Sequence, residues 1–251
     1  MQPRIKLEGP VYAMGDIHGD VFTFEHVINH YDIKNCTIIL LGDVGIFRYR
    51  DYKRYIAMDQ LCKERNIVVY AIRGNHDNPG FYRSKKESSS IALRFWDKFT
   101  NFKPVVDFTE VEVGGEVGIA IGGATSIDRC LRKGYQRSEP PRNLYSSNDW
   151  WSDEVLPDTS ALNGTYDFIL SHCGPRPTMI AVLRPERCAF MQMDRALEND
   201  INKENEQIMK IHEQIKPKKW WFGHFHVNER FNLHDTVCYA TDICNLTPIH
   251  L

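Results

Sequence analysis

Three apolar runs near the beginning of the chain each end in a glycine followed by polar residues. They are VYAMGDIHG at residues 11–19, TIILLGD at residues 37–43 and IVVYAIRGNHD at residues 67–77. Short apolar runs bounded by turn residues are typical of buried strands. Residues 22–31 and 51–65, which separate the runs, carry apolar residues at helical spacing. This alternation predicts an α/β fold in which parallel strands are joined by right-handed crossovers.

The remainder of the chain continues the pattern with one long interruption. Alternating apolar residues predict a β-hairpin over residues 105–121, and an amphipathic stripe predicts one long helix from Phe190 to Ile215. We further expect a short helix at 91–99, strands at 166–170 and 220–222, and one or two closing strands. The sequence therefore predicts one domain over residues 1–251, with a long irregular insertion at about 125–164.

Composition excludes several classes of protein. The 251 residues are 42% hydrophobic and 25% charged with a net charge of −2, which is typical of globular proteins and gives no overall attraction to nucleic acid. The seven cysteines form no CxxC pair, which favours reduced thiols. No run approaches the roughly 18 apolar residues of a membrane span, and the N-terminus does not resemble a secretory signal. We expect a cytoplasmic protein with no membrane partner, and the sequence does not indicate an oligomeric state.

Polar side chains gather where the apolar runs end. In open α/β sheets, ligands bind outside the carboxyl ends of the strands, so such side chains converge there. Oxygen and imidazole ligands can hold a pair of divalent metal ions, which activate water and clamp phosphoryl oxygens. The residues concerned are Asp16, His18, Asp43, Asn75, His76, Asp77, His172, His224 and His226. The pattern predicts a dinuclear metal-dependent phosphoesterase.

Each motif taken alone has an ordinary structural explanation. A Gly-Asp after a strand is usually a simple turn, and His172 alone would more often be a packed or surface histidine. His224 and His226 alternate along an extended segment and could share one side by coincidence. The motifs favour a metal site jointly, because independent coincidences would also have to occur in the right order.

The order of these motifs resembles that of the calcineurin-like metallophosphoesterases. The resemblance covers residues 10–226 and lies in five segments: GDIHG at 15–19, GD at 42–43, GNHD at 74–77, SH at 171–172 and GHFH at 223–226. It implies a four-layer α/β/β/α sandwich with mixed sheets and an active site at the C-terminal ends of the strands.

The resemblance also implies a role for each metal ligand. Asp16, His18 and His226 would bind one ion, Asn75, His172 and His224 would bind the other, and Asp43 would bridge the two. Two divalent ions are expected, with Mn²⁺ favoured and Fe or Zn²⁺ as alternatives, since all three suit mixed nitrogen and oxygen ligands.

The expected reaction is an in-line attack on phosphorus by a hydroxide held between the two metals. The resemblance implies that His76 assists by protonating the leaving oxygen or by stabilising charge on it. Asp77, the next residue, is a candidate to orient the His76 ring, as carboxylates commonly do for imidazoles. His76 and Asp77 are therefore the expected catalytic residues.

The chain departs from the protein Ser/Thr phosphatase branch of the family. That branch carries Asp-Arg-Gly after the second motif, whereas residues 42–47 read GDVGIF, so the usual phosphate-binding arginine is absent from its place. Asn75, Arg73 and Arg48 are the expected substrate-binding residues, and Arg73, Arg48 or Arg50 could substitute for that arginine. Arg48 and Arg50 could instead lie at a solvated helix start. Segments 122–128, 149–154 and 219–224 look closer to a bacterial and phage group of small metallophosphoesterases.

Two further features bear on the substrate. Basic residues crowd segments 128–142 and 83–86, where they could attract a polyphosphate anion or lie in a solvated loop. Trp150 and Trp151 could stack on a base or anchor the loop. We expect a small phosphate mono- or diester, with a nucleotide or nucleic-acid end favoured. The alternatives are a Ser/Thr phosphoprotein phosphatase, a nuclease on longer DNA or RNA, and a non-catalytic binding scaffold.

Overall fold

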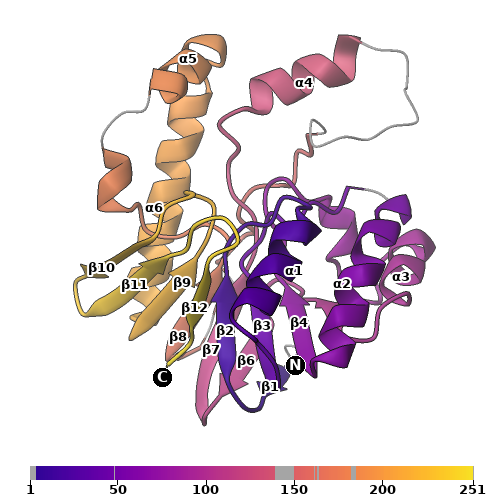
Figure 1. Cartoon of the computed structure of the whole chain (residues 1–251). Helices are drawn as coiled ribbons and strands as arrows, with labels where there is room; N and C mark the ends of the chain where they lie inside the picture. The colour runs from indigo at the N-terminus through magenta and orange to yellow at the C-terminus, as the bar shows by residue number, and fades with distance from the viewer. Residues whose placement is uncertain are drawn as a thin grey trace.

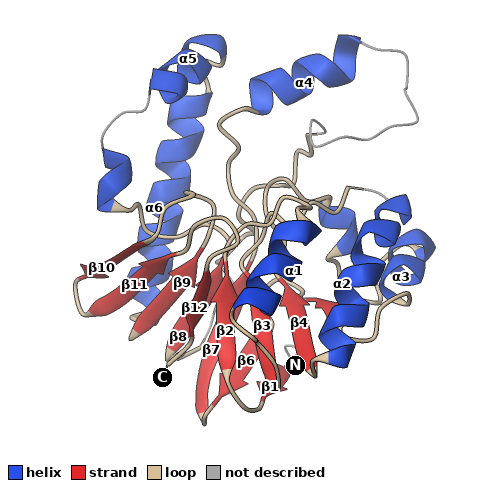
Figure 2. Ribbon diagram, viewed as in Figure 1, coloured by secondary structure: helices blue, strands red, loops and turns tan. Residues whose placement is uncertain are grey.

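Two mixed β-sheets stack face to face in the computed structural model, and helices cover their outer faces (Figures 1 and 2). The structure describes residues 4–47, 49–138, 150–160, 162, 164–181 and 185–250. The expected four-layer α/β/β/α arrangement with mixed sheets is confirmed. Among the described residues, no helix has both the length and the apolar composition needed to cross a bilayer.

One sheet has five strands in the order β12-β2-β3-β4-β5. Its parallel strands are β2 (Val11–Met14), β3 (Cys36–Leu40), β4 (Ile67–Ala71) and β5 (Phe102–Pro104), and β12 (Leu246–Pro248) is antiparallel to β2. Its outer face is covered by α1 (Val21–His30), α2 (Tyr52–Glu64) and α3 (Ser90–Trp96). The predicted sequence of strands and helices up to residue 99 is thus confirmed.

The second sheet has seven strands in the order β1-β6-β7-β8-β9-β11-β10. They are β1 (Arg4–Leu7), β6 (Glu110–Val113), β7 (Glu116–Ile121), β8 (Phe168–Ser171), β9 (Lys219–Phe222), β10 (Glu229–Leu233) and β11 (Thr236–Ala240). The expected hairpin is β6–β7, which turns at Gly114 and Gly115. The closing strands number three, β10 to β12, rather than the one or two expected.

The central strands β3, β8 and β9 are largely apolar because both of their faces are buried. On β3, Ile38 packs toward the helices, while the next residue, Ile39, packs between the sheets. On β9, Trp220 and Phe222 face the helix α6 (Leu197–Ile215), and Trp221 lies between the sheets. This is why the sequence shows continuous apolar runs instead of an alternating pattern. The core between the sheets holds their strand ends at a common edge.

The long helix expected from Phe190 to Ile215 is two helices, α5 (Pro185–Met193) and α6. Asp194 lies between them and accepts a hydrogen bond from the Ala196 backbone amide at 3.1 Å and another from Arg129 at 2.7 Å. A side chain that bonds its own nearby backbone competes with the helical pattern. The single-helix prediction is therefore wrong, although its apolar stripe continues along α6.

The insertion at 125–164 is not wholly irregular, since it contains α4 (Arg129–Ser138), which lies above the strand ends (Figure 1). Arg129 pairs with Asp194 and Asp200 at 2.7 and 2.8 Å. Arg132 is buried and pairs with Glu154 at 2.7 Å. These two arginines therefore hold α4 in place and do not form part of a solvated positive surface.

Gly42 lies where the end of β3 meets His172, and its backbone φ is +99°. A Cβ at this position would come within 2.2 Å of the His172 ring. We expect Gly42→Ala to lower the free energy of unfolding by at least about 1 kcal/mol, because alanine is strained at positive φ and also clashes. Urea unfolding followed by circular dichroism measures the change.

Gly134→Ala is the matched control, since a Cβ added there meets no neighbour. Alanine in a helix is favoured over glycine by about 1 kcal/mol, so this variant should be as stable as the wild type or slightly more stable. Equal stability of both variants would show that the close approach at Gly42 is not a constraint on the fold.

Candidate metal centre

The loops that follow five strands converge at one edge of the sandwich (Figure 1). The loop after each strand contributes at least one polar side chain: Asp16 and His18 after β2, Asp43 after β3, Asn75 and His76 after β4, His172 after β8, and His224 and His226 after β9. The active-site edge is where the sequence predicts it. The side chains form two neighbouring groups.

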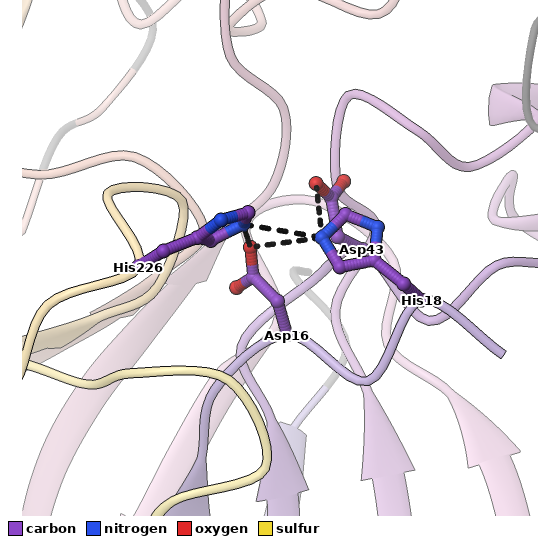
Figure 3. A group of neighbouring side chains, drawn as sticks. All are labelled: Asp16, His18, Asp43 and His226. Atoms are coloured by element: carbon purple, nitrogen blue, oxygen red, sulfur yellow. Dashed lines mark hydrogen bonds and ion pairs between the residues drawn. The ribbon is translucent and has the colours of Figure 1, made fainter. Parts of the chain in front are cut away.

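The first group consists of Asp16, His18, Asp43 and His226 (Figure 3). The Nε2 atoms of His18 and His226 lie 3.1 Å apart, and the latter is 2.9 Å from an Asp16 oxygen. His18 Nε2 is 3.7 Å from Asp16 and 3.8 Å from Asp43. One ligand atom from each of the four residues lies within 4.8 Å of the others.

This arrangement fits a divalent cation. Two imidazole nitrogens that face each other at 3.1 Å cannot both present lone pairs unless a proton or a cation lies between them. Ligand atoms about 2.0–2.2 Å from one metal are roughly 3–3.5 Å from each other, close to the spacings in this group. Nitrogen and carboxylate oxygen together suit Mn²⁺, Fe and Zn²⁺.

The second group is centred on Asn75. Its side-chain oxygen lies 2.7 Å from His172 Nε2 and 3.0 Å from His224 Nδ1. Its amide nitrogen donates to Ser126 Oγ at 2.7 Å, which turns the oxygen toward the two histidines. His172 Nδ1 donates to the Leu41 carbonyl at 2.7 Å, so Nε2 carries the free lone pair. The residues expected to hold the second metal are therefore brought together.

Asp43 lies between the two groups. One carboxylate oxygen is 3.3 Å from His172 Nε2, and the other is 3.8 Å from His18 Nε2. The first oxygen also accepts the His76 backbone amide at 2.8 Å, which fixes the orientation of the carboxylate. Asp43 thus contacts both groups through one carboxylate, and its role as a bridge between two metals stays a prediction.

Burial and charge adjust the protonation of these ligands. Burial alone would raise the pKa of Asp16 and Asp43, but nearby histidines hold both pKa values below the usual range. Burial, together with the proximity of His172, lowers the pKa of His224 to about 3. The hydrogen bond to Asp16 raises the pKa of His226. The site thus combines two buried anions with a neutral imidazole at His224, as metal binding requires.

The loops hold four of these residues in a left-handed backbone conformation. The φ angles are 45° for His18, 46° for Asp43, 66° for His224 and 51° for His226. For residues with a Cβ this conformation costs roughly 1–2 kcal/mol each. Such strain is common at functional sites, where contacts with the surrounding structure hold the backbone in the strained conformation.

Asp77 does not contact the His76 ring as expected. Its carboxylate accepts the backbone amides of Gly74 and Gly45, at 2.8 and 2.7 Å, as well as those of Val44 and Ile46. Burial and the charge of Asp43 raise its pKa. The prediction that Asp77 orients His76 is wrong. Asp77 instead joins the loops after β3 and β4, which positions Asp43 and Asn75 beside each other.

Of the two arginines expected to bind substrate, the structure describes Arg73 but not Arg48. Arg73 is buried, and its guanidinium donates to Asp107 at 2.9 Å and to the carbonyls of Glu154 and Val155 at 3.0 and 2.9 Å. It anchors the C-terminal part of the insertion and is not directed at a substrate, so that prediction is wrong. Arg48 lies outside the described residues.

Asp128 is a site residue that the sequence alone does not single out. Its carboxylate lies 3.9 Å from His76 Nε2 and 3.2 Å from Arg132 Nε. Arg132 also contacts Ser126 and the Asn75 carbonyl. Asp128 therefore takes the place next to His76 that we expected for Asp77. The only sequence signal is its position at the end of the segment GGATSID, which does not reveal a contact with a residue so far away in the chain.

Trp150 and Trp151 make different contacts. The Trp151 ring is parallel to that of Phe47, with centroids 6.3 Å apart. Lys133 Nζ lies 4.0 Å above the Trp150 ring, as in a cation–π contact. Anchoring, one of the two interpretations considered, is what these contacts show for Trp151.

The family model described as "Calcineurin-like phosphoesterase" matches residues 9–228 of the chain. A comparison with curated protein sequences finds no match. Among solved structures, the phosphopantetheinyl hydrolase PptH of Mycobacterium tuberculosis has a TM-score of 0.52 at 11% identity, covering 98% of this chain and 97% of that one. The TT1561 protein of Thermus thermophilus has a TM-score of 0.48 at 12% identity, covering 94% and 89%. At this identity, the likeness to PptH shows a common fold.

Replacing site ligands should change the metal content in steps. After chelation and reloading with Mn²⁺, we expect about two ions per wild-type chain. His226→Ala should retain about one, because only the first group loses a ligand, and Asp43→Ala should lose most of both. Inductively coupled plasma mass spectrometry of the desalted protein measures the content. His26→Ala, on the exposed surface of α1, is the control and should match the wild type. Equal loss in His26→Ala and His226→Ala would contradict the assignment.

Proposed function

Because this chain belongs to the calcineurin-like phosphoesterase family, we propose that it is a dinuclear metallohydrolase acting on a small phosphate mono- or diester, with a nucleotide favoured. The observation that carries the proposal is the meeting of both ligand groups at the single carboxylate of Asp43. Family membership supports a phosphoric ester hydrolase. The complete ligand set argues against a non-catalytic scaffold.

Asp16, His18 and His226 are the proposed ligands of one ion, Asn75, His172 and His224 those of the other, and Asp43 a ligand of both. Mn²⁺ is the favoured metal, and Fe or Zn²⁺ would suit the same ligands. Such ions, when bound, supply Lewis acidity toward phosphoryl oxygens and activate water. Asn75 commits one amide hydrogen to Ser126 and retains a second that can reach a substrate oxygen.

His76 is the proposed general acid. Its side chain is 20% exposed, its ring lies 5.4 Å from that of His18, and it lines the same cavity as Asp43. From this position it can donate a ring proton to the oxygen of the departing alcohol. Its backbone amide holds Asp43, so one residue supports both the metal ligand and the proton transfer.

Asp128 is the proposed positioning residue for His76. Its carboxylate forms an ion pair with Arg132. Arg132 also pairs with the buried Glu154, and this second ion pair fixes the position of Arg132. A carboxylate facing an imidazole fixes the orientation of the ring. Among the described residues, these ion pairs engage the charge of Arg132, so that this charge is not free to contact a long polyanion such as DNA or RNA.

The first test compares hydrolysis of p-nitrophenyl phosphate and bis-p-nitrophenyl phosphate by chelated and Mn²⁺-reloaded protein. We expect Mn²⁺-dependent turnover of at least one ester. For an ester of a poorly leaving alcohol, such as benzyl phosphate, His76→Ala should lower kcat by about 10²–10⁴ because the general acid is lost, with the metal content unchanged; the decrease should be smaller for the p-nitrophenyl esters. Absence of metal-dependent turnover on any phosphate ester would refute the proposal, and loss of metal in His76→Ala would make His76 a ligand instead.

Asp128→Asn should lower kcat by about tenfold or more for esters of alcohols that are poor leaving groups, with little change in KM. The decrease should be smaller for p-nitrophenyl phosphate, because this leaving group needs less protonation. A merely structural role would lower both rates alike. Asp153→Asn is the control, since Asp153 is an exposed carboxylate paired only at the surface with Arg83. Its kcat should equal that of the wild type for both substrates.

A further inference from the structure

A cavity of about 390 Å³ opens directly from the candidate metal centre. Part of its lining comes from Asp43, Asn75, His76, His224 and His226, which belong to the proposed reaction site. A volume in this range matches sites for small organic ligands. Whatever is joined to the phosphate of a bound ester must therefore lie in or beside this cavity.

Apolar walls make up half of the remaining lining residues. They are formed by Ile127 before α4, Ile180 in the short 3-10 helix Thr178–Ala181, Phe190 on α5, Ile201 on α6 and Phe225 after β9. Ile127 is 39% exposed, and the other four are partly buried. Apolar side chains gathered around an open space without being covered by the protein indicate a ligand site.

Phe225 brings this apolar wall next to the metal ligands. It stands between His224 and His226 in the chain, and its ring packs edge-on against those of His224 and Phe222, at 5.0 and 5.9 Å between centroids. These contacts fix the ring on the side of the cavity closest to the site. A planar group attached to the phosphate through a short linker would meet this ring first.

Five polar residues complete the lining, and three of them are Thr125, Asp128 and Glu204. Arg176, whose guanidinium donates to the Ile180 carbonyl at 3.2 Å, and Asn205 on α6 both reach the cavity. Small numbers of polar groups in an apolar pocket set the orientation of a ligand. A flat group with hydrogen-bonding edges matches this combination better than a sugar alone, which would leave its hydroxyls against apolar walls.

We propose that this cavity selects phosphate esters whose alcohol carries an aromatic ring, and that the apolar wall to which Phe190, Ile201 and Phe225 contribute determines this specificity. The inference rests on the proposed function, because the phosphate is placed by the metal centre. Two sources share the chemistry: a nucleotide, whose ring is a base, and a simple arylalkyl phosphate. The apolar side chains of Ile180, Phe190 and Ile201 thus form the wall that recognises the organic half of the substrate.

The test compares two pairs of esters, and in each pair one ester carries an aromatic ring that the other lacks. Adenosine 5′-monophosphate is compared with ribose 5-phosphate, and benzyl phosphate with methyl phosphate, whose alcohols have similar basicity. In the Mn²⁺-loaded protein, the ring-bearing member should have a kcat/KM at least about tenfold higher, as the burial of one ring would give. Preference in the first pair alone identifies a base site, whereas preference in both identifies a general aromatic site.

Phe190→Ala should reduce the preference ratio about fivefold or more. Met193→Ala, on the same helix but exposed and outside the cavity lining, is the matched control and should keep the wild-type ratio. Equal kcat/KM within both pairs would overturn the cavity proposal while leaving the phosphoesterase intact.

Measuring the binding of the same four compounds by calorimetry tests the cavity proposal separately from the proposed hydrolase activity. Ring-dependent binding that Phe190→Ala weakens, without turnover of any ester, would support the cavity and refute the hydrolase. Binding that does not depend on the ring would overturn the cavity proposal whatever the rates are.

Discussion

Two carboxylates, Asp16 and Asp43, are buried at the edge where the two sheets meet, and both are held ionised. Burying an anion is unfavourable unless positive charge or hydrogen-bond donors surround it. Imidazoles from four separate loops surround the two carboxylates. Backbone amides, among them those of His76 and His224, donate hydrogen bonds to them. The close approach of the loops, the glycine at Gly42 and the left-handed backbone at the histidines all follow from crowding these ligands around two anions.

Much of this could be predicted from the sequence because the relevant signals are local. A strand buried on both faces gives an apolar run, and the residue that follows it must lie at the sheet edge, so the ligand-bearing loops were predictable. The break at Asp194, the buried role of Arg73 and the pairing of Asp128 with His76 depend on partners far away in the chain. A charged residue looks the same in a sequence whether it faces solvent, a substrate or a buried carbonyl. The local pattern therefore placed Arg73 and Asp77 near the site but could not give their contacts.

The proposed metal ligands and the proposed substrate-recognition residues come from two different sets of elements. The strand ends of the two sheets carry the proposed metal ligands, and these lie on a rigid core. Above that edge, α5 and α6 supply apolar walls through Phe190 and Ile201, and the Asp128–Arg132 pair lies at the beginning of α4. Chemistry and recognition can therefore change independently, since a substitution on α5 leaves the ligand loops untouched.

The left-handed backbone at His18, Asp43, His224 and His226 also has a thermodynamic consequence. Strain and like charge are concentrated in one small volume, and a cation bound there would relieve the repulsion between Asp16 and Asp43 in the native state. Folding and metal uptake would then be linked equilibria, so free metal would raise the melting temperature by mass action. Stripping the ions would loosen the edge loops before it loosened the layers beneath them.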